Sequence, residues 1–181
     1  MGSRLKRVHM IGNAHIDPVW LWQWPEGYQE VRASFQSAID RLDEYPDFVF
    51  TCDSSLFFAW VEETDSELFE RIREKVAEGR FQVIGGWWIE PDCNLPCGES
   101  FVRQALYGQR YLREKFGITA TTGANIDSFG HNGTIPQILA KSAGSLSSIH
   151  SKKSDESHVK TKPGYSSTRS IAEWKVARTS W

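Results

Sequence analysis

Two kinds of hydrophobic pattern alternate along the first three quarters of the chain. Short β-prone runs occur at residues 7–16, 48–53, 81–88 and 120–127. Each run precedes a longer stretch in which apolar residues recur at steps of three and four, as on one face of an α-helix. Strands that alternate with helices are typical of parallel strands joined by crossover helices. The pattern therefore predicts an α/β fold with about four parallel strands.

The helical stretches also carry signals for their ends. The first is predicted to stop before Pro46, and Thr64 with Glu67 is typical of a capping box at the start of the second. Gly79 and Gly117 follow the second and third stretches, where glycine is the usual helix stop. The apolar stripe of the first stretch consists of Val31, Phe35, Ala38, Ile39 and Leu42.

The alternation is lost after Lys141. Residues 142–181 are rich in serine and poor in large apolar side chains, and their seven Lys or Arg against three acids give a net charge of +4. We therefore divide the chain into a partial folded domain, residues 1–141, and a Ser/Lys-rich tail, residues 142–181, expected to be disordered or non-native. An ordinary solvated tail and a natural continuation replaced through a gene-model or reading-frame error both fit this composition.

Charge, the length of apolar runs and the number of cysteines bear on partners and on the cellular setting. The 181 residues carry a formal net charge of −2. Because the tail contributes +4, residues 1–141 carry a net charge of −6, which argues against a nucleic-acid binder. No window approaches the roughly 18 consecutive apolar residues of a membrane span, so we expect no membrane partner. Three cysteines are an odd number and do not resemble a disulfide framework, which favours a cytoplasmic setting.

Candidate metal ligands follow two of the predicted strands. His15 and Asp17 are two residues apart in "GNAHIDPVWLWQW", so they lie on one face at the end of the first strand. Asp127 ends the fourth strand in "GANIDSFGHN", and the carboxyl ends of parallel strands form one edge where catalytic groups collect. Zinc accepts imidazole and carboxylate ligands. The alternatives are a hydrogen-bonded pair at a strand end and a helix cap by Asp127, and His131 is expected to order its loop.

Aromatic and acidic residues beside these strand ends suggest a sugar ligand. Flat rings stack on the apolar faces of sugars, and carboxylates accept hydrogen bonds from hydroxyl groups. Trp20 and Trp88 are the tryptophans nearest to the strand ends and are the expected ligand contacts, with Glu90 and Asp92 as acidic partners. Core packing is the expectation for the remaining members of the cluster, which are Trp22, Trp24 and Trp87.

Three motifs together resemble a known family. "GNAHIDPVWLW", "GGWWIEPDCNLPCGESFVRQ" and "GANIDSFGHNGTIPQIL", in this order, are similar to the N-terminal catalytic domain of glycoside hydrolase family 38, and the resemblance covers roughly residues 5–142. It implies the N-terminal part of an irregular seven-stranded β/α barrel. It also implies that His15 and Asp17 bind zinc, that Asp127 is both a zinc ligand and the catalytic nucleophile, and that Trp20 lines a mannose subsite.

The resemblance implies a zinc-dependent retaining α-mannosidase with one ion per site, although another divalent metal is an alternative. Its substrate would be an α-mannoside oligosaccharide, cleaved at terminal α-mannosyl residues. The family's fourth ligand, a histidine, and its acid/base aspartate lie beyond the region that matches, so we expect this polypeptide to be inactive as a truncated chain. Two rival readings are an inactive glycan- or metal-binding fragment and a zinc-dependent carbohydrate deacetylase-like hydrolase.

Overall fold

The structure, a computed structural model, describes residues 11–142 and the backbone of residues 148–150. The beginning of the first predicted strand and nearly all of the Ser/Lys-rich tail lie outside the described residues, so the division at residue 141 stays a prediction. No helix in the described ranges is long and apolar enough to cross a membrane.

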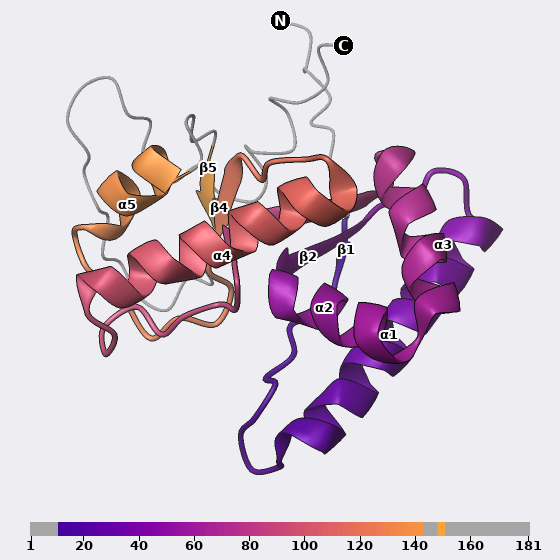
Figure 1. The fold of residues 1–181 in the computed structure, drawn as a ribbon, viewed down its shortest axis with the longest axis horizontal. Helices are drawn as coiled ribbons and strands as arrows, with labels where there is room; N and C mark the ends of the chain where they lie inside the picture. Colours follow the sequence, from indigo (N-terminus) through magenta and orange to yellow (C-terminus); the bar gives the residue numbers. More distant parts are fainter. Residues whose placement is uncertain (1–10, 143–147, 151–181) are drawn as a thin grey trace, which may run out of the picture.

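Strands and helices alternate in the predicted order. The strands are β1 (Gly12–Asn13), β2 (Phe50–Ser54), β3 (Phe81–Trp87), β4 (Thr122–Ala124) and β5 (Ser148–His150). The helices are α1 (Trp24–Glu44), α2 (Ser55–Thr64), α3 (Ser66–Ala77), α4 (Gly98–Phe116) and α5 (Ile135–Ser142). Figure 1 shows α1, α2 and α3 grouped near β1 and β2, with β4, β5 and α5 on the other side of the molecule.

All the strand pairs within the described residues are parallel. One sheet has the order β1-β2-β3, and β4 pairs with β5 in a second sheet. The predicted α/β class with parallel strands is therefore confirmed. The fourth predicted strand is present as β4, but it is shorter than expected and belongs to the second sheet, although it contacts β3.

One helix boundary differs from the prediction. The second helical stretch is two helices, α2 and α3, which meet at Asp65. The cap of α3 is Asp65 rather than Thr64, because the Asp65 carboxylate accepts a hydrogen bond from the backbone N–H of Leu68 at 3.1 Å. The Thr64 hydroxyl instead lies 2.6 Å from the carbonyl of Trp60, one turn back in α2. The predicted capping box is therefore wrong, and the true cap lies one residue later.

An apolar core joins the helices to the sheet. The five residues of the predicted α1 stripe are all buried, as the pattern required. At the centre the ring of Phe81, 1% exposed, packs against three other phenylalanines at centroid distances of 5.2–5.6 Å. We call these four residues, Phe35, Phe50, Phe58 and Phe81, the aromatic core. Each such ring contributes about 1.5–3 kcal/mol by burial.

Two glycines bend β3 away from a regular ladder. Cys52 pairs with Val83 but Ser54 pairs with Trp87, so two steps along β2 correspond to four along β3. Gly85 and Gly86 lie in this bulge with φ of +77° and +73°, a left-handed conformation that favours glycine. The bulge lies directly before Trp87, and Glu90 follows three residues later.

Candidate active site

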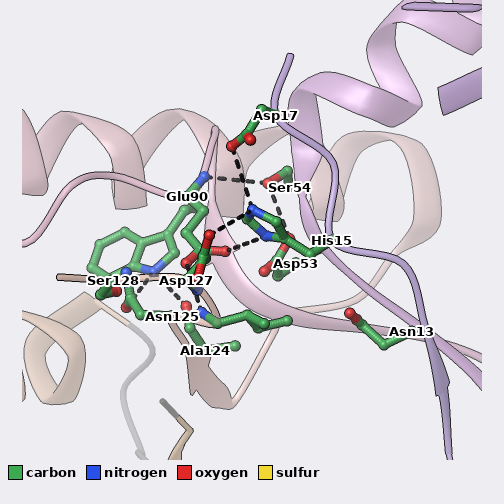
Figure 2. Close-up of polar contacts among 12 residues, drawn as sticks. Asn13, His15, Asp17, Asp53, Ser54, Glu90, Ala124, Asn125, Asp127 and Ser128 are labelled. Carbon is green, nitrogen blue, oxygen red and sulfur yellow. Dashed lines mark hydrogen bonds and ion pairs between the residues drawn. The ribbon is translucent and has the colours of Figure 1, made fainter. Parts of the chain in front are cut away.

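Acidic side chains from four strands gather around one histidine. His15 and Asp17 follow β1, Asp53 lies in β2, Glu90 follows β3, and Asp127 follows β4. We call these five residues the carboxyl edge, because each lies at or just beyond the carboxyl end of its strand. Figure 2 shows the imidazole of His15 with Asp17 above it and the Glu90 and Asp127 carboxylates beside it. The two predicted segments that carry candidate ligands therefore do meet.

The two predicted aspartate ligands both lie close to the same nitrogen of the third predicted ligand, His15. His15 Nε2 lies 3.4 Å from Asp17 Oδ1 and 3.8 Å from Asp127 Oδ2. The side chains of the two aspartates are 45% and 38% exposed, so solvent reaches this side of the imidazole. His15 therefore presents one ring nitrogen to two carboxylates at an open surface.

Hydrogen bonds between strands hold the His15 segment in place. The side-chain amide of Asn13 donates to the carbonyl and hydroxyl oxygens of Thr51 at 3.1 and 3.0 Å, which ties β1 to β2. The indole N–H of Trp22 donates to the backbone carbonyl of Asp17 at 3.0 Å and fixes the loop beyond β1. The backbone around His15 is thus anchored on both sides.

The Asp127 segment is anchored in a similar way by buried groups. The indole of Trp87, which is 0% exposed, donates to the carbonyl of Ala124 at 3.1 Å. Asn125 is also fully buried, and its side-chain amide donates to the carbonyl of Pro91 at 3.4 Å. These contacts fix the end of β4 at Ala124 and the next residue, Asn125, which lies two residues before Asp127.

Glu90 connects the two segments. Its Oε2 lies 3.5 Å from His15 Nδ1, the ring nitrogen that faces away from Asp17. Its Oε1 accepts hydrogen bonds from the backbone N–H groups of Ile126 at 2.6 Å and Asp127 at 3.0 Å. The Glu90 side chain, 11% exposed, is therefore largely enclosed between the two segments.

The charges of the carboxyl edge shift one another's protonation. The side-chain interaction with Glu90 raises the pKa of His15 to about 9, although burial lowers it. Burial raises the pKa of Asp53 to about 7, and the nearby charge of Glu90 acts in the same direction. For Glu90 itself burial is opposed by the contacts with His15 and Asp53, which hold its pKa below the usual range. The imidazolium and the Glu90 carboxylate thus stabilise each other.

The donor types of the carboxyl edge suit a metal ion, although no group of three or more His, Cys, Asp or Glu side chains in the described part is already arranged as a metal site. Two donor atoms bound to one tetrahedral zinc ion are about 3.4 Å apart, given bonds of about 2.0–2.2 Å. The 3.4 Å between His15 Nε2 and Asp17 Oδ1 matches this spacing, and the 3.8 Å to Asp127 Oδ2 requires a small closure.

The predicted sugar contacts are placed differently from one another. Trp20 is 66% exposed and packs edge-on against Trp22, so its ring is open to a ligand. The ring of Trp88 contacts Tyr111 of α4, with centroids 5.8 Å apart. Asp92 Oδ1 accepts hydrogen bonds from the backbone N–H groups of Asn94 and Leu95, so that oxygen holds the local turn. Sugar contact by any of the three stays a prediction.

The expectation of core packing for three other tryptophans is met only in part. Trp87 is fully buried and Trp22 is partly buried. Trp24, in contrast, is 59% exposed and contacts Trp60 of α2. Trp24 is the first residue of α1, and its exposure follows from a position at the helix end rather than on the buried stripe. The prediction for Trp24 was therefore wrong.

Sequence reasoning missed the roles of Asp53 and of Glu90 toward His15. Glu90 stood out only as a possible partner for hydroxyl groups, and Asp53 was simply the last residue of a predicted strand. The available signal was positional, since both lie at the carboxyl ends of their strands, where His15 and Asp127 were expected.

Comparison with known proteins identifies the family. Residues 6–165 match the family model described as glycosyl hydrolases family 38 N-terminal domain. Alpha-mannosidase G of Dictyostelium discoideum is 43% identical over 133 residues, which are 74% of this chain and 12% of that protein. Alpha-mannosidase 2C1 of Homo sapiens is 35% identical over 138 residues, 76% of this chain and 13% of that protein.

A solved structure supports the same fold. The crystal structure of an alpha-mannosidase from Enterococcus faecalis V583 superimposes with a TM-score of 0.69 at 23% identity, covering 78% of this chain and 16% of that one. The chain thus spans about an eighth of the length of the curated relatives it matches. Because the family model matches most of the chain, the protein belongs to the glycosyl hydrolase family 38 N-terminal domain family.

Proposed function

We propose that the carboxyl edge is the metal-binding and nucleophilic part of a zinc-dependent retaining α-mannosidase site. The proposal rests on one observation: the carboxylates of Asp17 and Asp127 both lie within 4 Å of His15 Nε2, at an open surface. The relatives described above are named alpha-mannosidases, which supports a mannoside as the substrate class. We further propose that the described strands are the N-terminal portion of the irregular seven-stranded β/α barrel implied by the resemblance.

The roles of the residues follow from the chemistry of retaining glycosidases. Such an enzyme forms a covalent glycosyl ester through a carboxylate nucleophile, with a second carboxyl group that protonates the leaving oxygen. Asp127 would be the nucleophile, because its side chain is 38% exposed while Glu90 holds its backbone N–H. The exposed ring of Trp20 would stack on the apolar face of the sugar.

A zinc ion would be held by His15, Asp17 and Asp127. When bound, it supplies a positive charge that can hold neighbouring sugar hydroxyl groups and orient the ring. Among the residues of the chain, Glu90 contacts the imidazole, and the hydrogen bonds of Trp87 and Asn125 fix the end of β4, which precedes the nucleophile.

The test uses a substrate that needs no acid catalyst. In a ring-fluorinated α-mannosyl fluoride, the Asp127 carboxylate attacks C1, the C1–F bond breaks, and the electron pair leaves with fluoride, so no proton donor is required. The ring fluorine slows hydrolysis of the resulting ester. We expect the 181-residue chain with zinc to carry the label on the peptide that contains Asp127, as detected by mass spectrometry.

Two controls separate catalysis from binding. Asp127→Asn removes the nucleophile and should abolish the label. Glu62→Gln, which removes a partly exposed carboxylate paired with Lys115 on the helix side, should leave the label intact. Zinc binding without any label would favour the rival reading of a metal-binding fragment, and a label on another carboxylate would contradict the role of Asp127.

A further inference from the structure

One carboxylate, that of Glu90, contacts both segments that form the proposed site. Its two oxygens are divided between them: Oε2 faces His15 Nδ1 at 3.5 Å, and Oε1 accepts from the backbone of residues 126 and 127 at 2.6 and 3.0 Å. The two segments are more than 100 residues apart in sequence, and each anchors Glu90 through a different kind of group. Glu90 is therefore a physical link between a side chain after β1 and a main chain after β4.

The backbone of Glu90 is itself fixed to a third strand. Its N–H donates to the hydroxyl of Ser54 at 3.2 Å, and that hydroxyl donates to Asp53 Oδ1 at 3.1 Å. Ser54 and Asp53 are 1% and 7% exposed, so this connection lies inside the protein. A side chain with its backbone tied to β2 and its carboxylate enclosed has little freedom to leave the contacts with His15 and Asp127.

Such a carboxylate can act on a histidine ligand without touching the metal. A histidine that binds a metal through one ring nitrogen usually donates the other N–H to a carboxylate or carbonyl, which fixes the tautomer and the ring orientation and makes the binding nitrogen more basic. In this chain Glu90 lies at Nδ1, and the two candidate carboxylate ligands lie at Nε2. The arrangement therefore has the polarity that is usual for a metal-binding histidine.

We propose that Glu90 is a positioning residue that sets the His15 ring and the Asp127 backbone at the same time. This inference rests on the proposed function for the identity of the metal, but not for the contacts themselves. One oxygen of Glu90 acts through charge on the imidazole, and the other acts through hydrogen bonds that a neutral amide oxygen can also accept. The two actions are therefore separable by substitution.

The first measurement is the zinc affinity of the 181-residue chain by calorimetry. Glu90→Gln keeps an oxygen for the backbone N–H groups but removes the charge beside His15, so we expect zinc to bind about 10–100-fold more weakly. Glu62→Gln is the matched control, because it removes a carboxylate that is also partly buried but lies on the helix side; its zinc affinity should equal that of the wild type.

The second measurement is amide hydrogen exchange at Ile126 and Asp127. Glu90→Ala removes the acceptor and should accelerate exchange at both amides by about tenfold or more, whereas Glu90→Gln should exchange as slowly as the wild type. A purely structural role would change both readouts together, in proportion to the loss of stability. Weak zinc binding with preserved exchange in Glu90→Gln is the signature of positioning.

The outcomes distinguish this inference from the proposed function. If the wild-type chain binds no zinc, the proposed metal site fails, and the exchange measurement together with the NMR-detected Nδ1 proton of His15 decides the role of Glu90. Unchanged exchange and an unchanged His15 ring signal in Glu90→Ala would overturn the inference in either case. Equal zinc affinity of the wild type and Glu90→Gln would also overturn it.

Discussion

The aromatic core and the carboxyl edge are built in opposite ways, although β2 and β3 contribute to both: Phe50 and Phe81 begin these strands, and Asp53 and Glu90 lie at or beyond their carboxyl ends. Phe81 begins β3 among three other phenylalanine rings, whereas Glu90 follows the same strand among four ionisable side chains. The aromatic core consists of apolar rings that are held together by packing contacts. The edge holds two buried carboxylate oxygens, Asp53 Oδ2 and Glu90 Oε2, that have no hydrogen-bond partner within the described residues, although Glu90 Oε2 lies 3.5 Å from His15 Nδ1. The aromatic core therefore stabilises the fold, whereas the buried polar atoms of the carboxyl edge cost stability at the place where binding chemistry is expected.

The largest effect should come from breaking the aromatic core. Phe81→Ala would leave a cavity among tightly packed rings, and we expect it to lower the free energy of unfolding by about 3–5 kcal/mol. Leu95→Ala is the control, since Leu95 is 86% exposed and should change stability by less than about 0.5 kcal/mol. Urea unfolding measures both. A loss of less than 1 kcal/mol for Phe81→Ala would show that the ring cluster does not anchor the fold.

At the carboxyl edge a substitution should stabilise the protein. Burial raises the pKa of Asp53 to about 7 from 3.8, so the wild-type metal-free protein loses stability as pH rises from about 4 through 7. Asp53→Asn has no charge to bury and should be more stable by about 2 kcal/mol at pH 8, measured in the presence of a chelator. The gain should disappear near pH 4. A destabilised variant at pH 8 would contradict this account.

His15 should show the opposite pH dependence. Contact with Glu90 raises its pKa from 6.5 to about 9, so its contribution to stability is fully present below pH 6.5 and is lost as pH rises through 9. Because solvent reaches the ring, we expect about 1–2 kcal/mol. Comparing metal-free wild type with His15→Gln at pH 6 and pH 10 measures it. A difference that does not shrink with rising pH would rule out the ion pair as its source.

The smallest effect concerns the boundary between α2 and α3. Asp65 caps α3 through the N–H of Leu68 and also pairs with Arg32 at 2.8 Å. Asp65→Ala should therefore cost about 1 kcal/mol, while Glu67→Gln, at the position of the predicted capping box, should change stability very little. Thermal unfolding of both variants decides which residue caps the helix. Equal losses of stability in the two variants would support the predicted capping box instead.

The same contrast explains how much could be predicted from the sequence. Helices and their buried stripes follow from local periodicity, so the α1 stripe and the αL stop at Gly117, with φ of +68°, were predictable. The convergence of His15 with Asp127 followed from the rule for parallel strands. The contacts of Glu90 did not, because they depend on the bulge at Gly85 and Gly86, where β3 slips two positions against β2. Glycine pairs within strand patterns often mark bulges, but the size of the slip is set by packing.

The exposure of Trp24 and the cap at Asp65 were missed for a related reason. Both residues lie at the ends of helices, where a shift of one position decides between burial and solvent, or between one side-chain oxygen and the next. Thr64 and Asp65 are adjacent and both belong to residue types that cap helices, but the pattern with Glu67 indicated only Thr64. Geometry chooses among them, and that geometry is a property of how α2 and α3 pack.

Anomalous diffraction from crystals of the 181-residue chain grown with zinc tests the central claim most directly. The account predicts one anomalous peak about 2.0–2.2 Å from His15 Nε2 and from one carboxylate oxygen each of Asp17 and Asp127, with Glu90 still at His15 Nδ1. A peak held by other side chains, or an ordered carboxyl edge without metal at saturating zinc, would contradict it.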